Sequence, residues 1–150
     1  MKDVHVGFAV FTTALTSVVA VFGIWCWWRT RPSRWFWRLL RAVQASLVVL
    51  ALLGFILAAT LRERSDTLHL VYGVLPIVMS FFAEQFRIAS AQTVLDARGF
   101  ESAAAVGKLP ADEQRAVALA IIRREIGIMT LALVIIVVLL LRAAGTAPSM

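Results

Sequence analysis

Charged residues, cysteine and catalytic motifs are all scarce in this chain. Only 16% of its 150 residues are charged, 61% are apolar, and the mean hydropathy is +0.85. Soluble domains carry about 25% charged residues, so this composition excludes an ordinary soluble domain. The single cysteine, Cys26, excludes an internal disulfide and a cysteine-based zinc site.

Recognisable catalytic motifs are also missing. The sequence has no nucleophile elbow, phosphate-binding loop, H-E-x-x-H segment or pair of catalytic acids. No catalytic residue is predicted, and a non-enzymatic role is favoured while the question of enzymatic activity stays open.

Long uncharged runs are what the chain has instead. They cover residues 4–28, 42–61, 67–83 and 126–141, and about 20 apolar residues of helix cross a bilayer core. The sequence therefore predicts one integral membrane domain, residues 1–150, folded as an all-α, four-helix transmembrane bundle.

The basic residues are distributed unequally between the two ends of these spans. Eleven of the fifteen lie in the first and third loops: Arg29, Arg31, Arg34, Arg38, Arg41, Arg87, Arg98, Lys108, Arg115, Arg123 and Arg124. The other four are Lys2, Arg62, Arg64 and Arg142. Because short loops rich in Lys and Arg stay in the cytoplasm, we expect a multi-pass protein of the bacterial inner membrane with both termini outside. Basic residues that flank spans in this way orient a membrane protein and meet anionic lipid head groups, and they argue against nucleic acid as a partner.

The third and fourth spans are predicted to continue beyond the membrane. Helix-compatible sequence runs from Thr67 to Asp96 and from Pro110 to Arg142, and Gly99 is a natural stop. The second of these is about 50 Å long at 1.5 Å per residue, against a hydrocarbon core of about 30 Å. Residues 84–125 are therefore predicted to form a cytoplasmic helical hairpin with its tip at residues 98–109. Its apolar residues are expected to pack against each other before any partner.

All five tryptophans gather around the first loop: Trp25, Trp27, Trp28, Trp35 and Trp37. Indole rings favour the membrane–water boundary, so these residues are predicted to be an interfacial anchor. Inside the spans, small residues recur at helical spacing at Thr12, Thr16, Ala20 and Gly23 and at Ala51, Gly54 and Ala58. We expect both stripes to face other helices.

The only histidines, His5 and His69, are the first candidate site. Counted at 1.5 Å per residue from the inner boundary, their depths agree to about 3 Å or differ by about 12 Å, depending on which residue marks that boundary. Two histidines of a helical bundle can hold haem iron, with Tyr72 one turn away. A zinc site would need further ligands, for which only Asp3, Glu63 and Asp66 are near. The structural alternative is a pair of interfacial histidines.

A second candidate is a charge collar at the inner ends of the spans. Its members are Arg38, Arg41, Glu84, Arg87, Arg124 and Glu125. Carboxylates at the hydrocarbon edge are costly unless paired. We expect Glu84 to pair with Arg41 or Arg124, Glu125 to pair with Arg38 or Arg41, and Gln44 to join.

Three segments carry a resemblance to other proteins. They are Leu68-His69-Leu70-Val71-Tyr72-Gly73, Phe82-Ala83-Glu84-Gln85-Phe86-Arg87 and the stretch from Ala91 to Gly99. The chain resembles uncharacterised small integral membrane proteins of actinobacteria. The resemblance implies four helices and brings no activity, cofactor or catalytic residue with it.

Three functions are consistent with the sequence. The leading prediction is a non-enzymatic accessory or scaffold subunit that binds a protein partner or anionic lipid through its inner face. The alternative is a haem b electron-transfer protein ligated by His5 and His69. The third is a subunit of a homo-oligomeric channel, for which Thr12, Thr16 and Ser80 are the only polar candidates.

Overall fold

The computed structural model describes residues 2–61 and 67–146. They form five helices: α1 (Lys2–Trp28), α2 (Arg34–Leu61), α3 (Thr67–Asp96), α4 (Ala103–Val106) and α5 (Ala111–Gly145). Four of these helices are long and apolar enough to cross a membrane. The prediction of an all-helical chain with four long apolar helices is therefore confirmed.

The helices extend further than the uncharged runs that predicted them. α2 begins at Arg34, directly after Pro32 and Ser33, so Arg34, Arg38 and Arg41 belong to a helix and not to a loop. Arginine is a good helix former, whereas proline cannot continue a helix. The short helix α4, within residues 98–109, was not predicted.

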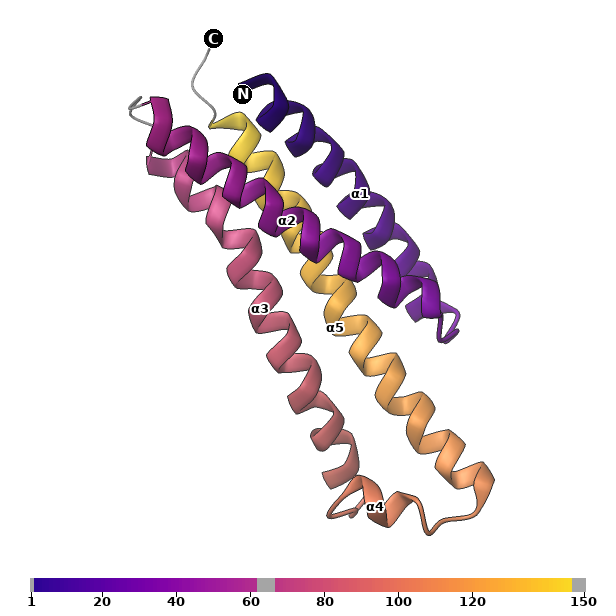
Figure 1. Ribbon diagram of the computed structural model, residues 1–150. Helices are drawn as coiled ribbons and strands as arrows, with labels where there is room; N and C mark the ends of the chain where they lie inside the picture. The colour runs from indigo at the N-terminus through magenta and orange to yellow at the C-terminus, as the bar shows by residue number, and fades with distance from the viewer. Residues whose placement is uncertain (1, 62–66, 147–150) are drawn as a thin grey trace.

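α5 is the central helix of the bundle. It packs along α3 and along α1, while α2 packs against α1 and α3 (Figure 1). α3 and α5 continue together past the turn between α1 and α2, and α4 connects them at the far end (Figure 1). We call this the hairpin end of the bundle, and the opposite end, where α1 begins and α5 finishes, the termini end.

The core lies between α1, α2 and α5, with Ala83 of α3 at its edge. Its fully buried members include Val19 and Cys26 of α1, Phe36 and Leu40 of α2, and Met129 of α5. The predicted stripe on α1 is confirmed as an interior face, because Thr12, Thr16, Ala20 and Gly23 are all buried. The stripe on α2 is different: Ala51, Gly54 and Ala58 are only half-buried, and the buried face of this helix consists of Phe36, Leu40, Val43, Ser46 and Leu47.

Gly23 allows the closest helix approach in the core. A Cβ atom built on it would lie 2.5 Å from Thr130 Oγ1 of α5 and 2.8 Å from Phe36 Cε2 of α2. Three helices therefore meet at a position where only a hydrogen atom fits.

The extension of α3 and α5 is closed by its own apolar residues. Val94, Leu95 and Val117 are buried, and Val106, Leu109, Leu119, Ile121 and Ile122 are half-buried. Gly99 follows the end of α3 with a φ of 75°, and Phe100 N donates to Leu95 O at 3.0 Å. A residue in the left-handed region after the last turn is a common helix stop, as predicted for this glycine.

Candidate functional site

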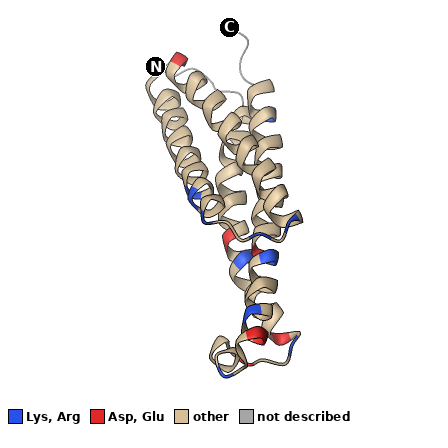
Figure 2. Cartoon of the chain, turned by 90° about the vertical axis from the view of Figure 1, so that its right-hand side faces the viewer, with Lys and Arg blue, Asp and Glu red and all other residues tan. Residues whose placement is uncertain are grey.

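Charged residues gather at the hairpin end in two bands, one beside the α1–α2 turn and one around α4 (Figure 2). Glu84 of α3 is the centre of the first band. Its carboxylate accepts hydrogen bonds from Arg41 Nη1 at 2.6 Å, from Gln44 Nε2 at 2.9 Å and from Arg87 Nε at 3.0 Å. Arg41 also donates to Gln44. α2 and α3 are thereby joined around one carboxylate.

Arg87 links this cluster to α5. Its Nη1 lies 3.4 Å from Glu125 Oε1, and its guanidinium lies 5.4 Å from the centre of the Trp37 ring. The prediction that Glu125 pairs with Arg38 or Arg41 is therefore wrong. Depth along a helix had identified residues at the same height, but it does not say which way each side chain points. The i,i+3 spacing of Glu84 and Arg87 was a signal for their pairing that the prediction did not use.

The two remaining predicted collar members stand apart from it. Arg38 lies over the Trp35 ring at 5.3 Å, and Arg124 is exposed. Among the described residues, neither makes an ion pair with a carboxylate. The collar is thus four charged residues, Arg41, Glu84, Arg87 and Glu125, whose charges cancel.

Three arginines at the α1–α2 connection are exposed, two in the turn itself (Arg29 and Arg31) and one at the first position of α2 (Arg34). Arg29, Arg31 and Arg34 have no carboxylate partner within the described part of the chain. Thr30 has a φ of 51°, and with Pro32 it lines a shallow pocket shared with Ile122 and Arg123 of α5. The turn therefore lies against α5, with Arg123 beside it.

The tryptophans surround this turn as predicted, but they do not all behave alike. Trp28 is 82% exposed and Trp35 is 64% exposed, whereas Trp37 is half-buried under Arg87. Trp27 packs on Gly127 of α5, where a built Cβ would lie 3.0 Å from the indole Nε1. The exposed rings are suited to a membrane–water boundary.

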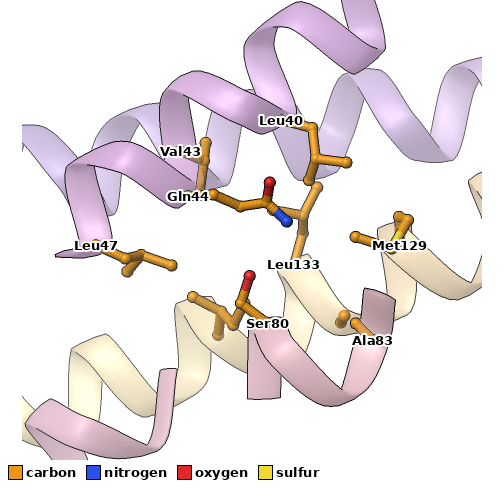
Figure 3. Close-up of a pocket in the computed structure, with 10 residues that line it drawn as sticks. Leu40, Val43, Gln44, Leu47, Ser80, Ala83, Met129 and Leu133 are labelled. Carbon is orange, nitrogen blue, oxygen red and sulfur yellow. The ribbon is translucent and has the colours of Figure 1, made fainter. Parts of the chain in front are cut away.

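A small cavity lies just beyond the collar. Its volume is about 10 Å³, and Leu40, Val43, Gln44 and Leu47 of α2, Ser80 and Ala83 of α3, and Met129 and Leu133 of α5 line it (Figure 3). Gln44 and Ser80 supply its polar atoms. This volume is close to the minimum for one water molecule, so the cavity is too small for a substrate.

The second candidate site lies at the termini end, where the structure brings the two histidines together. The ring centroids of His5 (α1) and His69 (α3) are 6.4 Å apart, with an angle of 68° between the ring planes. The sequence had left it open whether their depths match. The structure places them in contact range although 64 positions separate them along the chain.

Each histidine also contacts another helix. His69 Nδ1 lies 2.9 Å from the backbone oxygen of Ala143, in the last turn of α5. His5 faces Gly54 of α2, since a Cβ built there would lie 3.1 Å from His5 Cε1. All four long helices therefore contribute to the surroundings of the pair, and neither the Gly54 nor the Ala143 contact was predicted.

Among the described residues, this site has no further metal ligand and no slot for a haem. No group of three His, Cys, Asp or Glu side chains gathers within residues 2–61 and 67–146; Glu63 and Asp66 lie outside that part. Tyr72 is half-buried and makes no hydrogen bond or ring contact with a described residue. The two best-formed cavities of the described chain are small and lie elsewhere. A porphyrin would require the helices to separate.

The candidates for a channel lining are mostly inaccessible. Thr12 and Thr16 are fully buried between helices, and Thr16 Oγ1 donates to Thr12 O at 2.7 Å. Side chains buried inside one chain cannot line a pore between copies of it.

Comparisons with known proteins add no further constraint. No protein-family model, curated protein or solved structure matches this chain.

Proposed function

We propose that this chain is a non-enzymatic, multi-pass protein of the bacterial inner membrane that binds anionic lipid head groups. In this proposal the hairpin end faces the cytoplasm and both termini lie outside. The protein serves as an accessory or scaffold subunit, and its extended hairpin stands in the cytoplasm where a partner can reach it.

The orientation is supported by the distribution of basic residues. Eleven of the fifteen lie at the hairpin end or on the hairpin, and Lys and Arg accumulate on the cytoplasmic side of membrane proteins. The exposed tryptophans at the same level are consistent with a boundary there, because indole is enriched at membrane–water interfaces.

The observation that carries the proposal is the contrast between two sets of arginines at that level. Arg41 and Arg87 are neutralised by Glu84 and Glu125. Arg29 and Arg31 of the α1–α2 turn and Arg34 at the start of α2 are exposed, without a carboxylate partner among the described residues. A lipid phosphate is the anion available at this depth, and each basic residue near an anionic membrane surface contributes about 1 kcal/mol of attraction.

The hairpin supports an accessory role because it closes on itself and still offers a surface. Val94, Leu95 and Val117 are buried inside it, while Phe86 and Ile88 are exposed beside its polar outer residues and tip. Such a surface is suited to a reversible contact with a partner rather than to a catalytic pocket.

The test is the retention of anionic lipid. We expect protein from mild detergent to retain phosphatidylglycerol or cardiolipin over phosphatidylcholine, measured by native mass spectrometry. The triple variant Arg29→Gln, Arg31→Gln, Arg34→Gln is expected to lose this preference. The matched control is Arg98→Gln, Lys108→Gln, Arg115→Gln, which removes the same charge from the hairpin.

Two results would contradict the proposal. One is a wild-type protein that shows no preference for anionic lipid. The other is an equal loss in both triple variants, because this would indicate a response to net charge and not a site at the turn.

A further inference from the structure

The histidine pair is a polar cluster of the described residues that the proposed function does not use. It lies at the termini end, whereas the arginines proposed to bind lipid lie at the hairpin end. An inference about this pair therefore stands or fails independently of lipid binding.

His69 is held in one tautomer by α5. A backbone carbonyl oxygen can only accept a hydrogen bond, so Nδ1 of His69 donates its proton to Ala143 O. The Nε2 lone pair of the neutral ring is then left free. Metal-ligating histidines commonly donate their other ring N–H to a backbone carbonyl in this way, which fixes the ring orientation.

This contact also has a structural function. The last four carbonyl groups of a helix have no helical partner, and Ala143 O near the end of α5 accepts from His69 as well as from Thr146 N at 3.3 Å and Thr146 Oγ1 at 3.1 Å. Such a cap accounts for Nδ1 of His69, but it leaves its Nε2 and the whole of His5 unexplained.

His5 carries a buried nitrogen without a partner. Its Nδ1 is inaccessible to solvent and makes no hydrogen bond with any described residue. Burial of an unpaired polar atom costs roughly 1–3 kcal/mol, so a partner for this atom would stabilise the protein. Gly54 gives the ring its room, because a side chain at that position would press on His5 Cε1.

The separation of the rings fits one metal ion between them. A metal–imidazole bond is about 2.0–2.1 Å, and a ring nitrogen lies about 1 Å from its own ring centroid. Two nitrogens on opposite sides of an ion therefore place the centroids about 6 Å apart, by these bond lengths. The observed separation is 6.4 Å.

We propose that His5 and His69 bind a single Cu(I) ion, through the unpaired Nδ1 of His5 and the free Nε2 of His69. Imidazole is a good ligand for copper, and Cu(I), a closed-shell ion, accepts two ligands in a near-linear arrangement. Zinc requires about four ligands, and no third protein ligand joins the pair among the described residues. Haem would need a slot that the described residues do not form.

The experiment is a titration of the full chain in detergent, carried without a histidine tag and on a Cys26→Ala background. The thiol must be removed because thiolate is a strong Cu(I) ligand, and Cys26 is buried in the core at the other end of α1. Under anaerobic conditions, Cu(I) is supplied from a chromophoric chelator that competes for it. We expect one Cu(I) per chain, and an affinity at least about tenfold lower in His5→Ala and in His69→Ala.

Asp3→Asn is the matched control. It removes the acidic residue nearest to His5 in the sequence but leaves both rings in place, so its affinity is expected to equal that of the background. His5→Ala is the decisive variant, because His5 makes no hydrogen bond with a described residue and its removal breaks none. X-ray absorption at the copper edge is expected to show two nitrogen neighbours at about 2 Å.

Three results would overturn the proposal. The first is no stoichiometric Cu(I) binding on the Cys26→Ala background. The second is unchanged binding in the folded His5→Ala variant. The third is a purified protein with a Soret band that His5→Ala removes, because haem would then be the occupant.

Discussion

The two ends of the bundle are built differently. Towards the hairpin end, α2 buries Phe36, Leu40, Val43, Ser46 and Leu47, and Glu84 has three hydrogen-bonding partners. Towards the termini end, none of the described residues 2–11, 50–60 or 67–75 is buried, and the residues that are buried at this end, Leu140 and Ala143, belong to α5. The polar contacts there include the histidine pair and the bond from His69 to Ala143.

This contrast assigns a different task to each end. At the hairpin end the collar is neutral in itself and joins α2, α3 and α5, which leaves the turn arginines available for the proposed lipid contact. At the termini end α1, α2 and α3 bury no described side chain in residues 2–11, 50–60 and 67–75, so these helices could adjust around the proposed ion at a smaller energetic cost. Regions with few buried apolar contacts are the ones that open or move most easily.

Removal of the central carboxylate is expected to have the largest effect. Glu84→Gln takes away the negative charge that Arg41 and Arg87 share, and hydrogen bonds to charged groups contribute about 1.5–3 kcal/mol each. Because Arg41 is 55% exposed and solvent weakens its share, we expect a total loss of about 3 kcal/mol in the free energy of unfolding. Unfolding in mixed micelles with increasing SDS measures this value.

Glu113→Gln is the control for that variant. Glu113 is exposed in the first turn of α5 and makes no ion pair with a described residue. A similar loss in both variants would mean that the collar does not stabilise the hairpin end.

A methyl group at the closest helix contact should have the next largest effect. In Gly23→Ala the new Cβ would meet Thr130 and Phe36 at distances below 3 Å, and overpacking costs about 1–3 kcal/mol. We expect the free energy of unfolding to fall by about 2 kcal/mol, measured in the same SDS assay. Gly7→Ala, on the same helix but with nothing within 4 Å, should leave stability unchanged or raise it slightly, since alanine is the better helix former.

A substitution inside the hairpin tests whether buried packing continues along α3 and α5 beyond the collar. Val117 is 2% exposed within the hairpin, so Val117→Ala is expected to cost about 1–2 kcal/mol through lost burial. The effect should be local, with faster hydrogen exchange across residues 88–120 and unchanged exchange in α1. Ile88→Ala, at a 60% exposed position, is the control. Uniformly faster exchange in both variants would show that the hairpin has no core of its own.

The features that the sequence predicted are those set by length and periodicity. Long uncharged runs indicate long helices, and small residues at helical spacing share one face, so α3 and the buried stripe of α1 were predicted closely, whereas the stripe on α2 is only half-buried. The start of α2 at Arg34 was missed because the arginines before residue 42 end the uncharged run. The prediction took the end of that run for the end of the helix. The helix continues into the interface because arginine favours helix.

The features that it could not predict depend on rotation about the helix axis. Each residue advances the side chain by about 100°, so Arg38, Arg41 and Arg87 share a level but point in different directions. Only Arg87 reaches Glu125. The meeting of His5 and His69 was undecided for a related reason, because their relative height depends on where each helix crosses the boundary and on how it tilts. The Ala143 carbonyl gave no sequence signal, since any residue at that position supplies the same oxygen.

The smallest expected effect is a methyl group at the termini end. Gly54→Ala places a Cβ 3.1 Å from His5 Cε1, the same kind of intrusion as at Gly23 but against a half-buried ring. The ring can turn aside, so we expect a loss of no more than about 0.5–1 kcal/mol in the SDS assay, below the range for overpacking a rigid core. Gly73→Ala, with nothing within 4 Å, is the matched control on α3. If Gly54→Ala destabilised the protein as much as Gly23→Ala, the termini end would be as rigid as the hairpin end, and the difference between the two ends would not hold.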